Sequence, residues 1–244
     1  MTVTDTTSTS PDVVDALTDL LSSIADGGSI RLLRLTRAPR AQERVDRDPD
    51  AQESFDRGLA VRAAAGLPFW DAVMLATEES ETGAPLKVFE AALLHQPLPL
   101  VRAETVVVDN LLRSRLRAAA SDVASGEVVA LESTIMTATG VQLHLPMLDF
   151  ASKAKRPGAR GAVEAAVRAL GMPGLLLESG QSFHFYGRSL MDADAMQTFL
   201  TRAVLLAPVV DQRWVAHQLL ERACSLRISP TSRGGWPRLI AELW

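Results

Sequence analysis

The residues best placed for chemistry lie in one short segment, "ESGQSFHFYG", which covers positions 178–187. This segment brings Gly180, Ser182 and His184 close together in the chain. A serine held on a strained glycine turn would act as a nucleophile. Alternatively, hydroxyl, imidazole and backbone N–H groups beside a glycine would bind phosphate oxygens. The secondary structure that carries the segment decides between these two kinds of chemistry.

The pattern after the glycine turn predicts a strand. A nucleophile elbow has a second glycine two residues after its serine and a helix directly behind it, but here that position is His184. Period-two alternation places Ser182, His184 and Tyr186 on one strand face and Phe183 and Phe185 on the other. The serine-hydrolase interpretation therefore loses its structural context. What remains is a hairpin whose polar face either binds phosphate or faces solvent.

Two acids and a basic loop accompany this segment. Asp149 closes an apolar run, and Asp211 lies between an apolar run and a helix, where it would also serve as an N-cap. Carboxylate oxygens near phosphates are typical ligands of a hard divalent cation. The basic loop directly after Asp149 would either contact a nucleic-acid backbone or be solvated. Its basic residues are Lys153, Lys155, Arg156 and Arg160.

The order of these motifs along residues 127–238 resembles the archaeo-eukaryotic primase superfamily, which includes primase small subunits and primase-polymerases. Its members carry a hydrophobic-Asp-hydrophobic-Asp strand, a Ser-x-His hairpin, and a hydrophobic-Asp motif followed by an arginine-bearing strand. Asp149 matches the first motif, Ser182 and His184 match the second, and Asp211 matches the third. Arg227, in "SLRISPTS", is similar to the arginine that approaches the incoming nucleotide.

The resemblance implies metal-assisted nucleotidyl transfer from a nucleoside triphosphate onto DNA or RNA. Asp149 and Asp211 would then be the catalytic residues and would hold Mg²⁺ or Mn²⁺. The basic loop would contact the nucleic acid. The residues expected to bind the nucleotide are Ser179, Gly180, Ser182, His184 and Arg227.

One position departs from the family pattern. If Asp149 is the first acid of the strand motif, Ala151 occupies the place of the second; if Asp149 is the second, Met147 occupies the place of the first. We favour the first register because "MLDF" has the apolar approach that the motif requires. The missing acid leaves two other interpretations open: a catalytically inactive nucleotide- or nucleic-acid-binding module, or a scaffold whose N-terminal half is the working surface.

The elements expected around these motifs predict an α+β fold. Residues 1–10 have almost nothing to bury and are predicted to form a disordered tail. Residues 11–125 are predicted to be a mostly helical region. Residues 126–244 read as β-hairpin, helix, β-hairpin, two helices and strand, which predicts an RRM-like, primase-type sheet with helices on it.

Composition narrows the class of protein further. The 244 residues are 47% hydrophobic, which is ample for a sizeable core. No run of about 18 apolar residues and no basic-then-apolar N-terminus occurs, so we expect a cytoplasmic protein without a membrane partner. The lone Cys224 excludes an intrachain disulfide. Residues 1–150 carry an excess of acids and residues 151–244 an excess of bases, which is compatible with an anionic ligand on the C-terminal part.

Overall fold

The computed structural model describes residues 12–36, 49–78, 85–93, 99–231 and 235–244. The predicted tail of residues 1–10 lies outside this range. Contacts divide the chain into two compact units, the smaller within residues 37–99 and the larger from the remainder. This division differs from the predicted boundary near residue 125, because the first helix and strand belong to the same unit as the C-terminal half.

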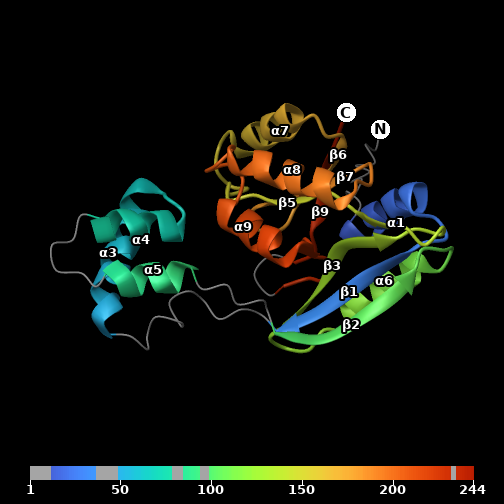
Figure 1. Cartoon of the computed structure of the whole chain (residues 1–244), viewed down its shortest axis with the longest axis horizontal. Helices are drawn as coiled ribbons and strands as arrows, with labels where there is room; N and C mark the ends of the chain where they lie inside the picture. The colour runs from blue at the N-terminus through green and yellow to red at the C-terminus, as the bar shows by residue number, and fades with distance from the viewer. Residues whose placement is uncertain (1–11, 37–48, 79–84, 94–98, 232–234) are drawn as a thin grey trace, which may run out of the picture. The chain divides into compact units, whose positions relative to one another are not determined.

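The larger unit contains two antiparallel sheets, the first of which has the strand order β2-β1-β3-β4, with β8 also paired to β3 (Figure 1). Helix α1 (Val13–Ile24) contacts α6 (Leu112–Ser121), and α6 contacts β2 and β3 of this sheet. The strands are β1 (Ser29–Thr36), β2 (Leu100–Val107), β3 (Glu127–Met136), β4 (Gln142–His144) and β8 (Ser225–Arg227).

The second sheet has the order β5-β7-β6-β9 and carries the hairpin singled out in the sequence. Helix α7 contacts β9, and α9 contacts β5. The strands are β5 (Met147–Asp149), β6 (Gly174–Glu178), β7 (Phe183–Gly187) and β9 (Arg238–Leu243). The helices are α7 (Ala159–Leu170), α8 (Ala193–Val204) and α9 (Gln212–Glu221).

Short polar and glycine signals fix the ends of these helices. The Asp192 side chain accepts a hydrogen bond from Ala195 N at 2.8 Å, which satisfies a free N–H group at the start of α8. Helix α7 stops at Gly171, whose φ of 70° is a left-handed conformation that glycine adopts without strain.

A proline divides one apolar stretch between the two sheets. The sequence "VQLHLPMLDF" has the composition of a single β run, but β4 ends before Leu145 and β5 begins after Pro146. Proline has no N–H group to donate to a strand ladder. Its carbonyl oxygen accepts from Gly187 N at 2.8 Å, while Leu145 N donates to Ser133 O at 2.8 Å. Consecutive residues therefore pair with different sheets.

The smaller unit is a helical cluster with its own core. It consists of α3 (Pro49–Ala65), α4 (Phe69–Glu78) and α5 (Pro85–Leu93). Phe55 and Val73 are buried, and the Phe55 ring lies 5.6 Å from that of Trp70 in an edge-on arrangement. In the described part of the chain, no single helix is long and apolar enough to cross a membrane, although α3 and α4, which meet at 116°, pass that test as a bent pair.

The α+β class is confirmed, with helices prominent in the N-terminal half and sheets in the C-terminal half. Three elements were not predicted: α4, β2 and β9. Strand β9 matters most, because it pairs with β6 and completes the sheet that carries the hairpin.

Candidate functional site

The turn between β6 and β7 is a tight four-residue hairpin. Ser179 N donates to Ser182 O at 2.9 Å, and the two hydroxyl oxygens of these serines lie 3.2 Å apart. Gly180 has φ = 106°, a conformation that side chains disfavour. A strand follows the turn where a nucleophile elbow requires a helix. The hairpin interpretation is therefore confirmed, and the serine-hydrolase interpretation is wrong.

His184 lies directly opposite Asp149 in the β5–β7 pair. Its Nε2 atom is 3.8 Å from Asp149 Oδ1. Only 6% of His184 is exposed, so the solvent-facing interpretation of this face is wrong. Burial, assisted by the charge of Arg227, lowers the pKa of His184 to about 3. The imidazole is therefore neutral at physiological pH and carries a single N–H donor.

A backbone hydrogen bond places Asp211 beside Asp149. Asp211 N donates to Asp149 O at 3.1 Å. The Asp211 carboxylate caps α9 by accepting from Arg213 N at 3.1 Å and from Trp214 N at 3.0 Å. The N-cap interpretation of Asp211 is thus correct, and the same contacts hold its carboxylate near the end of β5.

The two carboxyl groups interact electrostatically. Burial first, and then the negative charge of Asp211, raise the pKa of Asp149 to about 7. A backbone N–H group and the charges of Lys153 and Arg227 oppose this rise only in part. About a quarter of the Asp149 side chain remains exposed. Near neutral pH, Asp149 is therefore held close to half-ionisation.

Arg227 extends from β8 to the tip of the hairpin. Its Nη2 atom donates to Ser179 O at 2.6 Å, and its Nη1 atom donates to Ser229 O and, at 3.4 Å, to Gly235 O. Its positive charge lowers the pKa values of both His184 and Asp149. The four motif residues Asp149, His184, Asp211 and Arg227 are thus brought together from separate elements.

Two buried polar atoms on the His184 face find no hydrogen-bond partner within the described residues: His184 Nδ1 and the Tyr186 hydroxyl. We call these atoms the unsatisfied pair. The register opposes His184 to Asp149 and Tyr186 to Met147, so both side chains emerge on the same face of the sheet. Most buried polar groups in proteins are hydrogen-bonded, so these two atoms leave hydrogen-bonding capacity unused on this face.

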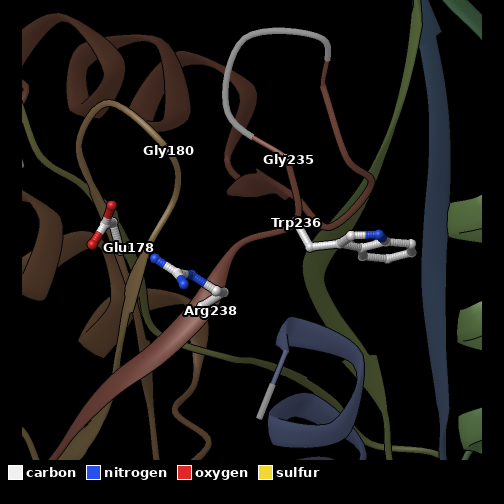
Figure 2. A pocket seen from close by; sticks show the side chains of 5 residues that line it. All are labelled: Glu178, Gly180, Gly235, Trp236 and Arg238. Carbon is white, nitrogen blue, oxygen red and sulfur yellow. The ribbon is translucent and has the colours of Figure 1, made fainter. Parts of the chain in front are cut away.

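A hollow of about 300 Å³ opens next to the hairpin tip (Figure 2). Glu178 and Arg238, direct partners on β6 and β9, contribute side chains of opposite charge, and in Figure 2 the guanidinium group points toward Glu178. The Trp236 indole points away from Glu178. The lining residues are Glu178, Gly180, Gly235, Trp236 and Arg238. Apart from Gly180, none of these residues was predicted from the sequence.

The basic loop is attached to the same hairpin tip, because Ala154 N donates to Gln181 O at 2.9 Å. Lys153, Lys155 and Arg156 are exposed beside the site. Arg160 differs: its Nε atom pairs with Glu164 at 2.8 Å, and its Nη2 atom donates to Ile240 O at 3.0 Å. Among the four residues predicted to contact nucleic acid, Arg160 therefore already uses its side chain for contacts within the larger unit.

The side-chain oxygens at this site can supply only part of the coordination shell of a metal ion. Within the described ranges, no group of three or more His, Cys, Asp or Glu side chains is arranged to hold a metal ion. Asp149 and Asp211 supply two carboxylates, and Ala151 supplies no side-chain oxygen. Mg²⁺ typically binds through one or two carboxylates plus substrate phosphates. The site thus fits a cation that arrives with a phosphorylated ligand.

An antiparallel α+β unit with clustered acids, a hairpin histidine and a strand arginine has the layout of a primase-type protein. Residues 107–236 match the family described as archaeo-eukaryotic primase 1D-like. This match covers more than half of the chain and includes every motif residue named above, so the chain belongs to that family. Neither the curated proteins nor the solved structures contain a match to the chain.

Proposed function

We propose that the chain is a divergent primase-polymerase-like protein that binds a nucleoside triphosphate together with Mg²⁺ or Mn²⁺. The observation that carries this proposal is the convergence of two carboxylates, a neutral imidazole and a guanidinium group in the region matched to the family. A cation beside the two carboxyl groups would favour the ionised form of Asp149, and the Arg227 charge favours phosphate.

Each motif residue has a role in this proposal. Asp149 and Asp211 hold the cation at the end of β5. His184 and the hairpin turn from Ser179 to Ser182 donate hydrogen bonds to phosphate oxygens, and Arg227 compensates their charge. The 300 Å³ hollow has no part in this assignment, because Glu178, which lines it, pairs with Phe183 and so emerges on the sheet face opposite His184.

Transfer of the nucleotide is expected to be inefficient in this chain. When bound, the cations would neutralise the triphosphate and activate the attacking 3′ hydroxyl of a primer. The carboxylate that most family members place two residues after Asp149 is absent at Ala151. We therefore propose that nucleotide binding is retained while primer extension is weak, and that Mn²⁺ supports it better than Mg²⁺, because Mn²⁺ accepts nitrogen ligands more readily.

The same absence favours the second candidate function, an inactive nucleotide- or nucleic-acid-binding module. Primer extension by the wild type, Ala151→Asp and Asp149→Ala separates the two. A weakened polymerase gains activity from Ala151→Asp and loses it with Asp149→Ala. An inactive module extends no primer in any of the three forms. Robust wild-type synthesis that survives Asp149→Ala would overturn the site assignment.

The exposed lysines of the basic loop extend the proposal to nucleic acid. Lys153 and Lys155 lie beside the hairpin tip, where the backbone of a DNA or RNA strand would pass close to Asp149. A cytoplasmic location remains part of this proposal.

A further inference from the structure

Tyr186 occupies an unusual position for a polar residue. Its side chain is fully buried, and its hydroxyl belongs to the unsatisfied pair, which has no hydrogen-bond partner among the described residues. A buried hydroxyl without a partner destabilises the folded protein, because it gives up its bonds to water and gains nothing in return. A phenylalanine would fill nearly the same volume without that loss. Folding stability alone therefore does not account for a hydroxyl at this position.

The surroundings of the hydroxyl connect it to the candidate site. The charges of Arg227 and Asp149 both act on the phenol. Burial raises the pKa of Tyr186 well above its usual range, so the group stays protonated and can donate a hydrogen bond. Exposure falls along this strand face from half-buried Ser182, through the His184 side chain at 8%, to Tyr186 at zero.

We propose that Tyr186 is a further ligand-binding residue, whose hydroxyl donates to an anionic phosphate oxygen of the nucleotide. This inference rests on the proposed function. The His184 Nε2 atom faces the Asp149 carboxyl at 3.8 Å, so the hydroxyl is the donor of the unsatisfied pair that no neighbouring group engages among the described residues. A buried hydroxyl donor fits an acceptor such as a phosphate oxygen.

The chain offers a clean probe for this contact, because Tyr186 is its only tyrosine. Protein labelled with ¹³C at the tyrosine ζ carbon gives a single NMR signal for this residue. We expect that signal to shift when a nucleoside triphosphate with Mg²⁺ is added, and to shift in the same direction with inorganic tripolyphosphate and Mg²⁺. A matching response to the two ligands assigns the contact to phosphate rather than to the nucleoside.

The Tyr186→Phe variant provides the second measurement. Without ligand it should melt at a higher temperature than the wild type, because the uncompensated hydroxyl is gone. Its affinity for both Mg²⁺-bound ligands should fall about tenfold, the loss expected for one hydrogen bond to a charged group.

The outcomes separate this inference from the function on which it rests. A wild-type protein that binds neither ligand overturns both. A wild type that binds, with an unmoved tyrosine signal and a Tyr186→Phe variant of equal affinity, overturns only the role of Tyr186. If the variant does not fold, the wild-type NMR titration decides, since a shift supports the contact and an unmoved signal contradicts it.

Discussion

Among the described residues, two histidines are buried in two different ways. His144, on β4, is 4% exposed, and its Nδ1 atom lies 3.5 Å from Ser133 Oγ. That hydroxyl also accepts from Cys224 N at 2.9 Å, and His144 N donates to Met191 O at 2.8 Å. Burial lowers the pKa of this imidazole too. The His144 region joins β3, β4 and the start of β8 through hydrogen bonds between its own residues.

His184 is buried to nearly the same degree, at 6% exposure, but its polar surroundings are incomplete. Within the described residues its Nδ1 atom and the Tyr186 hydroxyl have no partners, and the neighbouring acids repel one another. Burial and a lowered pKa therefore do not distinguish the two histidines. The distinction lies in whether the protein itself completes the hydrogen bonds and balances the charge.

The largest effect that would test this comparison is expected from Arg227→Met. The substitution removes the cation nearest the proposed triphosphate, and hydrogen bonds to charged groups contribute about 1.5–3 kcal/mol each. We expect the affinity for a nucleoside triphosphate with Mg²⁺ to fall about 100-fold by isothermal titration calorimetry. Arg202→Met, on the exposed side of α8, is the matched control and should bind as the wild type does. Equal binding by both variants would remove Arg227 from the site.

Matched substitutions of the two histidines address the comparison directly. His184→Gln should weaken nucleotide binding about tenfold and leave the melting temperature of the free protein nearly unchanged. His144→Gln should lower the melting temperature by several degrees, because it disrupts a completed buried network, and should leave affinity unchanged. Thermal unfolding gives the melting temperature of each variant, and calorimetry gives its affinity for the nucleotide. A large stability loss in His184→Gln alone would reverse the two assignments.

The dependence of stability on pH sharpens the contrast. The pKa of Asp149 rises on folding from 3.8 to about 7, so its unfavourable contribution is absent below pH 4, grows as pH rises, and is complete above pH 7. The pKa of His184 falls from 6.5 to about 3, so its contribution is absent above pH 6.5 and stability is lost as pH falls toward 3. The two slopes oppose each other between about pH 4 and pH 6.5.

The Asp149→Asn variant isolates the contribution of Asp149 to the pH dependence of stability. An asparagine keeps an oxygen for the hydrogen bond from Phe150 N, which is 2.9 Å long, and carries no charge. We expect the variant to melt a few degrees above the wild type at pH 8 and at the same temperature near pH 4. A gain of equal size at both pH values would show that charge repulsion is not its cause.

The smallest effect is expected in the basic loop. Replacing Lys153 and Lys155 with glutamine should weaken binding to single-stranded nucleic acid a few-fold and lower the slope of log affinity against log salt by between one and two. Arg160→Gln should change less, since that side chain is already engaged with Glu164 and Ile240. Binding titrations at several salt concentrations measure both. An unchanged slope in the lysine variant would place the nucleic acid elsewhere.

Local pattern was sufficient to predict the elements that carry the site. Alternation identified β7, glycine identified the turn at Gly180, and acids at helix starts identified the caps at Asp192 and Asp211. The short motifs also led to the family, which the match over residues 107–236 confirms.

Long-range pairing was less accessible from the sequence. Nothing local indicates that β9 returns to pair with β6, or that the polar face of β7 lies inside the protein. The sequence therefore identifies His184 and Tyr186 only as polar positions of an alternating strand, and it does not show that their polar atoms are buried without partners. A strand with polar residues on one face predicts solvent there, but His184 and Tyr186 are buried in the folded protein.

The proline break between β4 and β5 has a consequence for folding cooperativity. Two residues, Leu145 and Pro146, connect the His144 region to the strand that bears Asp149, and both sheets share one apolar core. A linker this short gives neither sheet the freedom to detach while the other stays intact. The larger unit should therefore lose both sheets in a single transition, and hydrogen exchange should report the same opening free energy for β3 and β7.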